Sequence, residues 1–371
     1  MKILFPCELF YPAKLGGPAN TIYWLAKALQ RNGMDVSVVT TDRYIDDTSV
    51  QTNCWTRIDG IRVRYCHTIG KFSLKVVYYA CSELNKSDVI IFSSICYLPN
   101  FPIFLKALLK RKKIIWSPRG ELFGSAVQGN RWKISYFQLL NFLSCGRILF
   151  HATSQDEKQS IQQIFGQTTK VVTIPNYMEL PRRCKRCEQK DKYLLYVGRI
   201  APIKAIDNLI RALAVSSFWK DSGYHLRLVG DVQDQFKDYY QKLLCLIEEY
   251  GLQNSVRFVG PLHGTEKYQS YANAQYLFLV SNSENFGNVV IESLSQGTPV
   301  VASKGTPWCK LEETGSGYWI ENTPDIIAKC IDEIIKMPSI EYECTRKRAL
   351  EFSKSFDVFD NVGEWELVLS R

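Results

Sequence analysis

The sequence lacks the features that mark several classes of protein. It contains no internal repeats and no low-complexity segments, and its composition is that of an ordinary globular protein. The N-terminus, MKILFPCELFYP, runs straight into a strand-like segment without a small-residue cleavage site, so we expect no signal peptide. The twelve cysteines are scattered along a long chain, which predicts reduced thiols in a cytosol rather than a disulfide framework.

Two further patterns are present only in part. The one CxxC, at residues 184–187, has no two additional ligands nearby, so we interpret it as an incidental pair, with a metal or redox site as the alternative. Residues 89–109 are mostly apolar and long enough to span a bilayer. Pro99, Asn100 and Pro102 interrupt this stretch, however, which predicts a strand, a loop and a helix of a buried core instead.

Charge is distributed unevenly along the 371 residues. Residues 1–190 carry 27 Lys and Arg against 13 Asp and Glu, whereas residues 191–371 carry 19 against 24. Basic clusters at 110–113 and 182–186 contribute to the excess, which suggests an anionic partner for the first half. No nucleic-acid-binding motif is present, so an anionic membrane surface or a phosphorylated lipid is the favoured partner, and a solvated basic face is the alternative.

Short apolar strands alternate with amphipathic helices along the whole chain. The expected strands lie at residues 2–6, 35–40, 61–66, 89–93, 113–117, 147–152, 171–174, 193–197, 225–229, 256–259, 276–280 and 299–302. The expected helices include residues 19–31, 132–143, 206–214, 235–250 and 326–336. This alternation predicts an α/β protein with two doubly wound parallel-sheet, Rossmann-like domains. The expected boundaries are an N-terminal domain at 1–175, a linker at 176–192, a second domain at 193–352 and a C-terminal helix at 353–371 that packs back on the first domain.

Ligands of open α/β sheets bind at the carboxyl ends of the strands, so the loops there are the candidates for the site. GGPAN (16–20) opens a helix with two glycines, which suits a close backbone approach to an anion. In VGRIAPIK, Arg199 and Lys204 follow a strand and suit a diphosphate. WSPRGEL places Arg119 and Gly120 at another strand end. Ordinary turns and surface cations are the alternatives at these three places.

The stretch SNSENFGNVVIES, at 281–293, carries two glutamates eight positions apart. A helix is expected to begin near Phe286, where its free N–H groups favour an anion, and Gly287 leaves room for a ligand. Eight helical positions span about 12 Å, so Glu284 and Glu292 could reach hydroxyls at the two ends of a sugar, diphosphate and ribose. An N-terminal acid followed by an exposed helix glutamate is the alternative.

These motifs together resemble glycosyltransferase family 4, whose members are retaining, nucleotide-sugar-dependent enzymes of the GT-B fold. The resemblance rests on GRIAPIKAIDNLI followed by SNSENFGNVVIESLSQGTPVVAS, and it extends through GGPAN and TPWCKLEETGSGYWI (306–320) to nearly the whole chain. SPRGEL and HATSQDEKQ are similar to a branch that builds bacterial surface polysaccharides. The resemblance implies two domains that face a cleft and a nucleotide-sugar donor, with a UDP-sugar favoured over a GDP-sugar.

The resemblance also implies roles for the residues of SNSENFGNVVIES. Glu284 would lie at the donor sugar as a catalytic residue, and Glu292 would hold the ribose. The substrate-binding positions between them would be Asn285, Phe286, Gly287 and Asn288.

The other motifs carry the remaining implied contacts. Arg199 and Lys204 match the catalytic pair that binds the diphosphate. The glycines that approach the phosphates from the first domain would be Gly16 and Gly17, and the segment beside the base would contain Val259, Gly260 and Leu262.

The sequence departs from the family in one respect. Many members have a histidine-glycine in the first domain whose histidine contacts the donor sugar, and here that region reads Arg119-Gly120. Arg119 is therefore the expected substrate contact. His151, in HATS, is the only other histidine that we expect at a strand end in this half, and a structural role is the favoured interpretation for it.

No Asp-x-Asp motif occurs in the chain, so we expect no catalytic metal and no cofactor beyond the donor. The expected acceptor is a saccharide, in particular one linked to a lipid diphosphate, handled in the cytoplasm or on the inner face of the cell membrane, without nucleic acid. A nucleotide-sugar epimerase of the same fold would use the same kind of site. A dinucleotide-dependent oxidoreductase would need GxGxxG, which is absent. A non-catalytic sugar-binding module is the third alternative.

Overall fold

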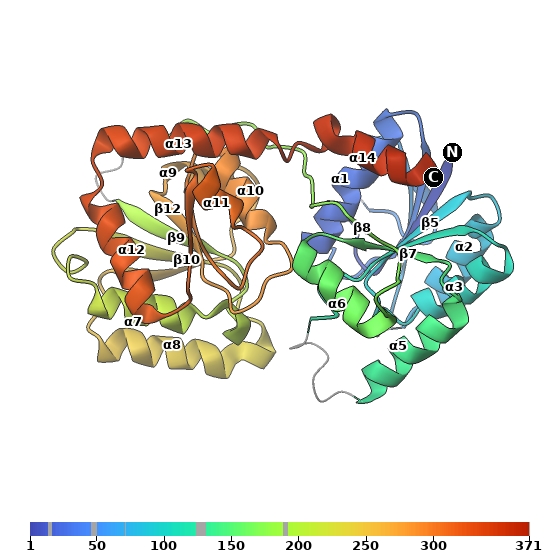
Figure 1. Cartoon of the computed structure of the whole chain (residues 1–371), viewed down its shortest axis with the longest axis horizontal. Helices are drawn as coiled ribbons and strands as arrows, with labels where there is room; N and C mark the ends of the chain where they lie inside the picture. The colour runs from blue at the N-terminus through green and yellow to red at the C-terminus, as the bar shows by residue number, and fades with distance from the viewer. Residues whose placement is uncertain (14–16, 46–49, 71, 124–130, 188–191, 371) are drawn as a thin grey trace. The chain divides into compact units, whose positions relative to one another are not determined.

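A computed structural model describes residues 1–13, 17–45, 50–70, 72–123, 131–187 and 192–370. The chain divides into two compact units (Figure 1). The first comprises Met1–Glu179 and Asp357–Arg371, and the second comprises Leu180–Phe356. One division thus falls inside the expected linker at 176–192, and the other inside the expected C-terminal segment.

The first unit is built on an eight-stranded sheet in the order β3-β4-β2-β1-β5-β6-β7-β8. Its strands are β1 (Lys2–Pro6), β2 (Asp35–Thr41), β3 (Trp55–Ile58), β4 (Ile61–Cys66), β5 (Val89–Ser93), β6 (Lys113–Ser117), β7 (Ile148–Ala152) and β8 (Val171–Thr173). Neighbouring strands are parallel except β3 and β4, which form an antiparallel hairpin. The strand order reverses between β1 and β5, which makes their carboxyl ends the natural ligand-binding point.

Helices cover this sheet and close its core. They are α1 (Gly17–Arg31), α2 (Leu74–Leu84), α3 (Asn100–Leu109), α5 (Arg131–Ser144), α6 (Gln155–Phe165) and α14 (Val358–Ser370). Although α14 ends the chain, it lies beside α1 (Figure 1). The Arg31 guanidinium stacks 4.1 Å from the Phe359 ring centroid, and Lys113 Nζ donates to the last carbonyls of α14, at Val368 and Leu369. A cation at a helix C-terminus stabilises the exposed carbonyl ends of the helix.

The second unit contains a six-stranded parallel sheet in the order β11-β10-β9-β12-β13-β14. Its strands are β9 (Tyr193–Val197), β10 (His225–Val229), β11 (Val256–Gly260), β12 (Tyr276–Leu279), β13 (Val300–Ser303) and β14 (Gly317–Ile320). The chain fills one side of β9 first and then crosses to β12, so the order reverses between β9 and β12. The prediction of two Rossmann-like parallel sheets is confirmed, although β3 and β14 were not expected.

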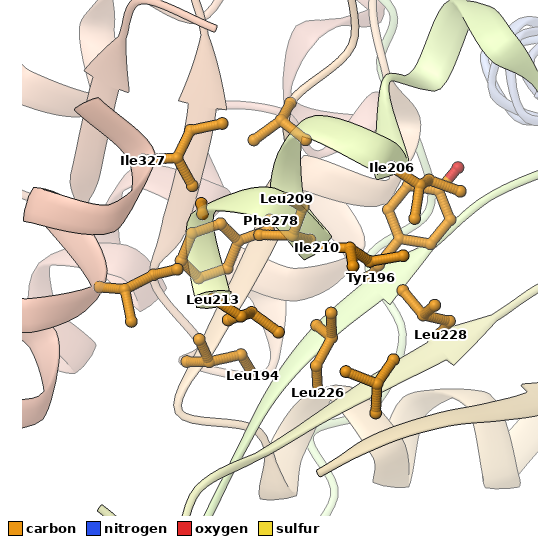
Figure 2. Packing of buried hydrophobic residues seen from close by; sticks show 14 of the residues in the cluster. Leu194, Tyr196, Ile206, Leu209, Ile210, Leu213, Leu226, Leu228, Phe278 and Ile327 are labelled. Carbon is orange, nitrogen blue, oxygen red and sulfur yellow. The ribbon is translucent and has the colours of Figure 1, made fainter. Parts of the chain in front are cut away.

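Helices on the second sheet enclose a continuous apolar core (Figure 2). They are α7 (Ile206–Val215), α8 (Lys237–Glu249), α9 (Gly264–Asn273), α10 (Asn288–Ser295), α11 (Lys310–Glu313), α12 (Pro324–Lys336) and α13 (Ser339–Lys354), with 3₁₀ turns at Pro202–Lys204 and Asp234–Phe236. Apolar residues of α7 recur at helical spacing and meet Leu194 of β9, Phe278 of β12 and Ile327 of α12. This packing fixes the ends of the two central strands.

The apolar stretch 89–109 forms β5, a loop and α3, as its prolines predicted. Among the described residues, no helix is long and apolar enough to cross a bilayer.

Candidate functional site

The predicted catalytic residues Arg199, Lys204 and Glu284 lie in the second unit, at the carboxyl ends of β9 and β12. These are the two strands between which the order of the sheet reverses. The segment after β9 contains Arg199 and ends in the 3₁₀ turn with Lys204, and the segment after β12 contains Glu284. Both predicted catalytic stretches therefore reach the place where open α/β sheets bind ligands.

Lys204 and Glu284 form an ion pair at this point, although 80 positions separate them in the chain. Their side chains are 13% and 18% exposed, so the pair is partly desolvated and still open to solvent on one side. Asn282 N donates to Ile203 O (2.8 Å), which ties the two loops together beside the pair. The arrangement places a cation and a carboxylate within reach of one bound molecule.

A third loop, after β13, supports Glu284 from behind. Glu284 N donates to Gly305 O at 2.9 Å, and Ser303 Oγ donates to Ser281 O. A Cβ on Gly305 would lie 2.4 Å from Asn282 O, so only glycine allows the two backbones to approach this closely. The position of Glu284 thus depends on a loop that the sequence motif does not include.

Gly287 links this loop to α10, and the fold itself requires glycine at this position. It caps the helix with φ of 85°, a left-handed conformation that favours glycine. A Cβ at this position would lie 2.8 Å from Leu279 Cδ2 and 3.3 Å from Glu284 Cγ. The side chain is therefore excluded by the protein itself, whatever a ligand requires. The helix begins at Asn288, two residues later than expected.

Phe286 points into the protein and anchors the loop before α10. It is 5% exposed, and its ring lies 5.1 Å from that of Trp308. Trp308 Nε1 also donates to the Phe286 carbonyl. Among the predicted positions, Phe286 thus holds the loop by its side chain, and any contact with substrate would come from its backbone. Asn285 and Asn288 are half-buried on either side of it.

Arg199 is exposed, in contrast to Lys204. Its backbone is held by the fully buried Tyr196, whose hydroxyl donates to Arg199 O at 2.7 Å. Burial, and then the Glu284 carboxylate, raise the pKa of Tyr196 well above its usual range, so the hydroxyl stays a donor. The loop is thereby fixed while the guanidinium remains accessible to an anion.

Glu292 is not the exposed helix glutamate of the alternative interpretation, because it is 4% exposed on α10. Lys267 Nζ lies 2.7 Å from its Oε1 and 2.6 Å from its Oε2. The Tyr271 hydroxyl donates to Oε2 at 2.8 Å. Both partners come from α9, and neither was recognised in the sequence, although their spacing of four places them on one helix face.

The predicted base-side segment lies at the end of β11. Gly260 ends the strand with φ of 83°, and its carbonyl accepts from Gly230 N at 3.0 Å. Val259 is 43% exposed, and Leu262 is half-buried. These residues lie at the carboxyl edge of the same sheet as Glu284, one strand beyond β10.

The remaining predicted residues belong to the first unit. Gly17 is the exposed first residue of α1, after β1, and Gly16 lies outside the described residues. Arg119 follows β6 in a left-handed conformation with φ of 59°. Its Nη1 donates to Asn176 Oδ1 at 2.9 Å, and burial lowers the pKa of its guanidinium to about 10. Arg119 is thus held from within the unit, and its contact with a substrate stays a prediction.

His151 has the structural role that was favoured for it. Its Nδ1 lies 2.8 Å from Ser117 Oγ, and its Nε2 lies 2.9 Å from Ile174 O, so the ring donates to the carbonyl and accepts from the hydroxyl. Burial, and then the charge of Arg119, lower the pKa of His151 to about 3. A neutral ring with both nitrogens engaged offers nothing to a substrate.

The expectation that His151 is the only other histidine at a strand end of the first half is wrong. His67 directly follows β4, and its Nδ1 lies 2.6 Å from Asp42 Oδ2, just after β2. The ring is 56% exposed. At the end of β1, Glu8 pairs with Arg43 at 2.5 Å. These polar pairs line the carboxyl edge of the first sheet, and the position of His67 after IRVRYC was visible in the sequence.

Comparison with known proteins adds to this geometry. Residues 182–352 match the family profile described as "Glycosyl transferases group 1", and residues 16–177 match "Glycosyl transferase 4-like domain". An uncharacterized glycosyltransferase of Haemophilus influenzae is 24% identical over 95% of this chain and 96% of its own. The GDP-mannose:cellobiosyl-diphosphopolyprenol alpha-mannosyltransferase of Xanthomonas campestris is 21% identical over 98% and 95%.

Solved structures share the fold over the full length. Anabaena HepE, crystallised with UDP and glucose, superposes with a TM-score of 0.78 at 20% identity, covering 100% of this chain and 99% of that one. At this identity, the similarity establishes the GT-B fold of the chain.

Proposed function

The chain belongs to the group 1 glycosyl transferases, and from this premise we propose which sugar transfer it performs and with which residues. We propose that it moves a sugar, with retention of anomeric configuration, from a nucleoside-diphosphate donor to a lipid-diphosphate-linked saccharide. The observation that carries this proposal is the Lys204–Glu284 pair at the point where the order of the second sheet reverses.

Lys204 and Arg199 would stabilise the leaving group. When the anomeric C–O bond breaks, negative charge grows on the nucleoside diphosphate, and cations fixed beforehand lower the energy of that state. Lys204 is already held in place by Glu284, while Arg199 is exposed on a fixed backbone and can turn toward the phosphates. The first N–H groups of α10, which begins at Asn288, would add donors on the same side.

Retention would proceed by front-face attack, with the departing phosphate accepting the proton of the acceptor hydroxyl. A covalent route needs a nucleophilic carboxylate close to a second one, as in retaining glycosidases. Glu284 is committed to Lys204, and Glu292 is committed to Lys267 and Tyr271. A glycosyl adduct trapped on Glu284 would contradict this route.

Donor and acceptor are inferred by relationship. UDP is bound in the Anabaena structure, and we favour a UDP-sugar, whereas the Xanthomonas relative is named for GDP-mannose. That relative is also named for a diphosphopolyprenol acceptor, which agrees with the positive charge of residues 1–190. We therefore propose a step in surface polysaccharide synthesis, such as lipopolysaccharide, capsule or exopolysaccharide, at the cytoplasmic membrane face and without a catalytic metal.

The melting temperature of the protein with UDP, GDP, ADP and no ligand tests the donor site. A ligand at about 100 times its dissociation constant adds about 2.7 kcal/mol of stability. One nucleotide should raise the melting temperature of the wild type but not of Arg199→Ala. Lys220→Ala, which changes an exposed lysine of the same unit, is the matched control and should keep the shift.

Turnover of the stabilising donor, measured in EDTA with and without a lipid-linked acceptor extract, tests the reaction. Sugar transfer that needs the acceptor and survives EDTA is expected. Release of an epimer or of free sugar without acceptor would instead indicate the epimerase alternative. No response to any nucleotide would contradict the donor site.

A further inference from the structure

Helix α5 of the first unit exposes large apolar side chains along its outer face. Trp132, Ile134, Leu139 and Phe142 are 56%, 44%, 45% and 78% exposed. The opposite face packs into the unit through Tyr136, Phe137 and Leu140. A surface helix of a globular protein normally carries mainly polar residues on its outer face, whereas α5 exposes these four large apolar side chains beside Ser135, Gln138 and Asn141.

The end of α3 extends this surface. Leu109 is 84% exposed, and the exposed Lys110 and Arg111 follow it. Arg147 Nη1, just after α5, donates to the carbonyl of Leu108 at 3.0 Å, which places the two helix ends together. We use the name α5 face for the surface formed by Leu109, Lys110, Arg111, Trp132, Ile134, Leu139 and Phe142.

The chain segment that contains α3 and α5 is strongly basic. Between Asp88 and Asp156 the chain has nine Lys and Arg but a single acidic residue, Glu121. Glu121 is turned inward, where its carboxylate accepts from Ser94 Oγ and Ile95 N, both at 2.6 Å. No acidic side chain of this stretch therefore offsets the cations.

Not every cation of the 110–113 cluster belongs to this surface. Lys112 Nζ donates to Ser87 O, and Lys113 Nζ donates to Val368 O at 2.7 Å. These two lysines serve the fold. Lys110 and Arg111 are the members of the cluster that face solvent. Arg131 and Arg147, at the two ends of α5, are also exposed.

We propose that the α5 face docks the first unit on an anionic lipid bilayer. A helix with exposed tryptophan, phenylalanine and leucine lies in the interface of a membrane, where its apolar side chains enter the acyl boundary. Lysines and arginines beside it are attracted to acidic headgroups. The combination of exposed apolar residues with an excess of positive charge fits such a surface better than a soluble anion, which would need no apolar contact.

This inference deepens the proposed function, because a lipid-linked acceptor is presented only at a membrane. The biological reason for membrane binding rests on the proposed function, but the physical argument for binding does not. Binding to vesicles requires neither a donor nor turnover, so the two can fail separately.

Flotation of the full-length protein with two kinds of vesicle tests the inference. One kind is phosphatidylcholine alone, and the other is an equal mixture of phosphatidylcholine and phosphatidylglycerol. Leu139→Ser/Phe142→Ser removes apolar contact, and Lys110→Ser/Arg111→Ser removes charge. Ile340→Ser is the control, since Ile340 is a 79% exposed apolar residue of α13 in the other unit.

The wild type and the control should float with the anionic vesicles and bind the neutral ones weakly. Loss of the two cations should weaken anionic binding about thirtyfold, given the usual attraction of each charge to acidic lipid. Loss of the two apolar side chains should weaken it more than about tenfold. All variants should keep a ligand-free melting temperature close to that of the wild type, which shows that they fold.

Equal flotation of the wild type and both double variants would overturn the inference. So would a dimer, seen by light scattering without lipid, that Leu139→Ser/Phe142→Ser converts to monomer, since a second copy would then be the partner of this face.

Discussion

The clamp of Lys267 and Tyr271 on Glu292 allows a quantitative prediction about the second unit. The Glu292 side chain is 5% exposed and Lys267 is 23% exposed, so removing the lysine would leave a buried carboxylate with Tyr271 as its remaining partner of the clamp. Uncompensated charges of this kind cost about 3–5 kcal/mol, and the partial exposure of Lys267 favours the lower end. Lys267→Met should therefore destabilise the protein by about 3 kcal/mol.

The double variant Lys267→Met/Glu292→Met provides the sharper result. Replacing both members of a buried ion pair by apolar groups is often nearly neutral, because no charge is left without a partner. The double variant should therefore be more stable than Lys267→Met. Tyr271→Phe, which deletes one hydrogen bond to a charged group, should cost about 1.5–3 kcal/mol.

Thermal melting measures these differences. For a unit of this size, about 3 kcal/mol corresponds to a fall of about 6–12 °C in the melting temperature. Lys242→Met is the matched control, because Lys242 is 53% exposed and lies 3.1 Å from Asp207, and a pair with an exposed partner is worth about 1 kcal/mol or less. If the effects of Lys267→Met and Glu292→Met simply added, the two side chains would not interact and the reasoning would be wrong.

Two further predictions concern single residues. Gly287→Ala should cost about 1–3 kcal/mol and lower the melting temperature, because it adds a Cβ 2.8 Å from Leu279 Cδ2 at a left-handed position; an unchanged melting temperature would show that the loop adjusts freely. The His151 pKa is lowered to about 3 in the native protein. Between about pH 6.5 and pH 3, the imidazole is therefore protonated in the unfolded chain but neutral in the native one. As the pH decreases through this window, the free energy of unfolding should fall by up to about 1.4 kcal/mol per pH unit. In His151→Gln, urea titrations at several pH values should show a weaker dependence of this free energy on pH. An equal slope in the variant would show that other groups cause it.

The unexpected hairpin shows what local sequence patterns can reveal. β3 and β4 are joined by Asp59 and Gly60, both with positive φ, and Asp-Gly between two apolar runs is a strong hairpin signal. β3 could therefore have been predicted. β14 was less accessible, because GYWI is short and its four residues are each only half-buried at the edge of the sheet.

In the candidate site, too, some residues could be predicted from local sequence and others could not. Residue type and strand position were enough to single out Arg199, Lys204, Glu284 and Glu292, because a strand end followed by cations or carboxylates is a local pattern. Their partners come from elsewhere in the chain. Lys267 lies 25 positions before Glu292, and no local pattern pairs them.

The order of strands and helices, and hence the two parallel sheets, followed from the sequence alone, because apolar periodicity is a property of neighbouring residues. Tertiary structure decided which charges are paired. It buried Glu292 against α9, joined Lys204 to Glu284, and turned Lys112 and Lys113 toward carbonyls while Lys110 and Arg111 stayed exposed. Burial and pairing depend on which segments meet in space, and a charged residue has the same letter in the sequence whether it stabilises a helix end or faces a partner.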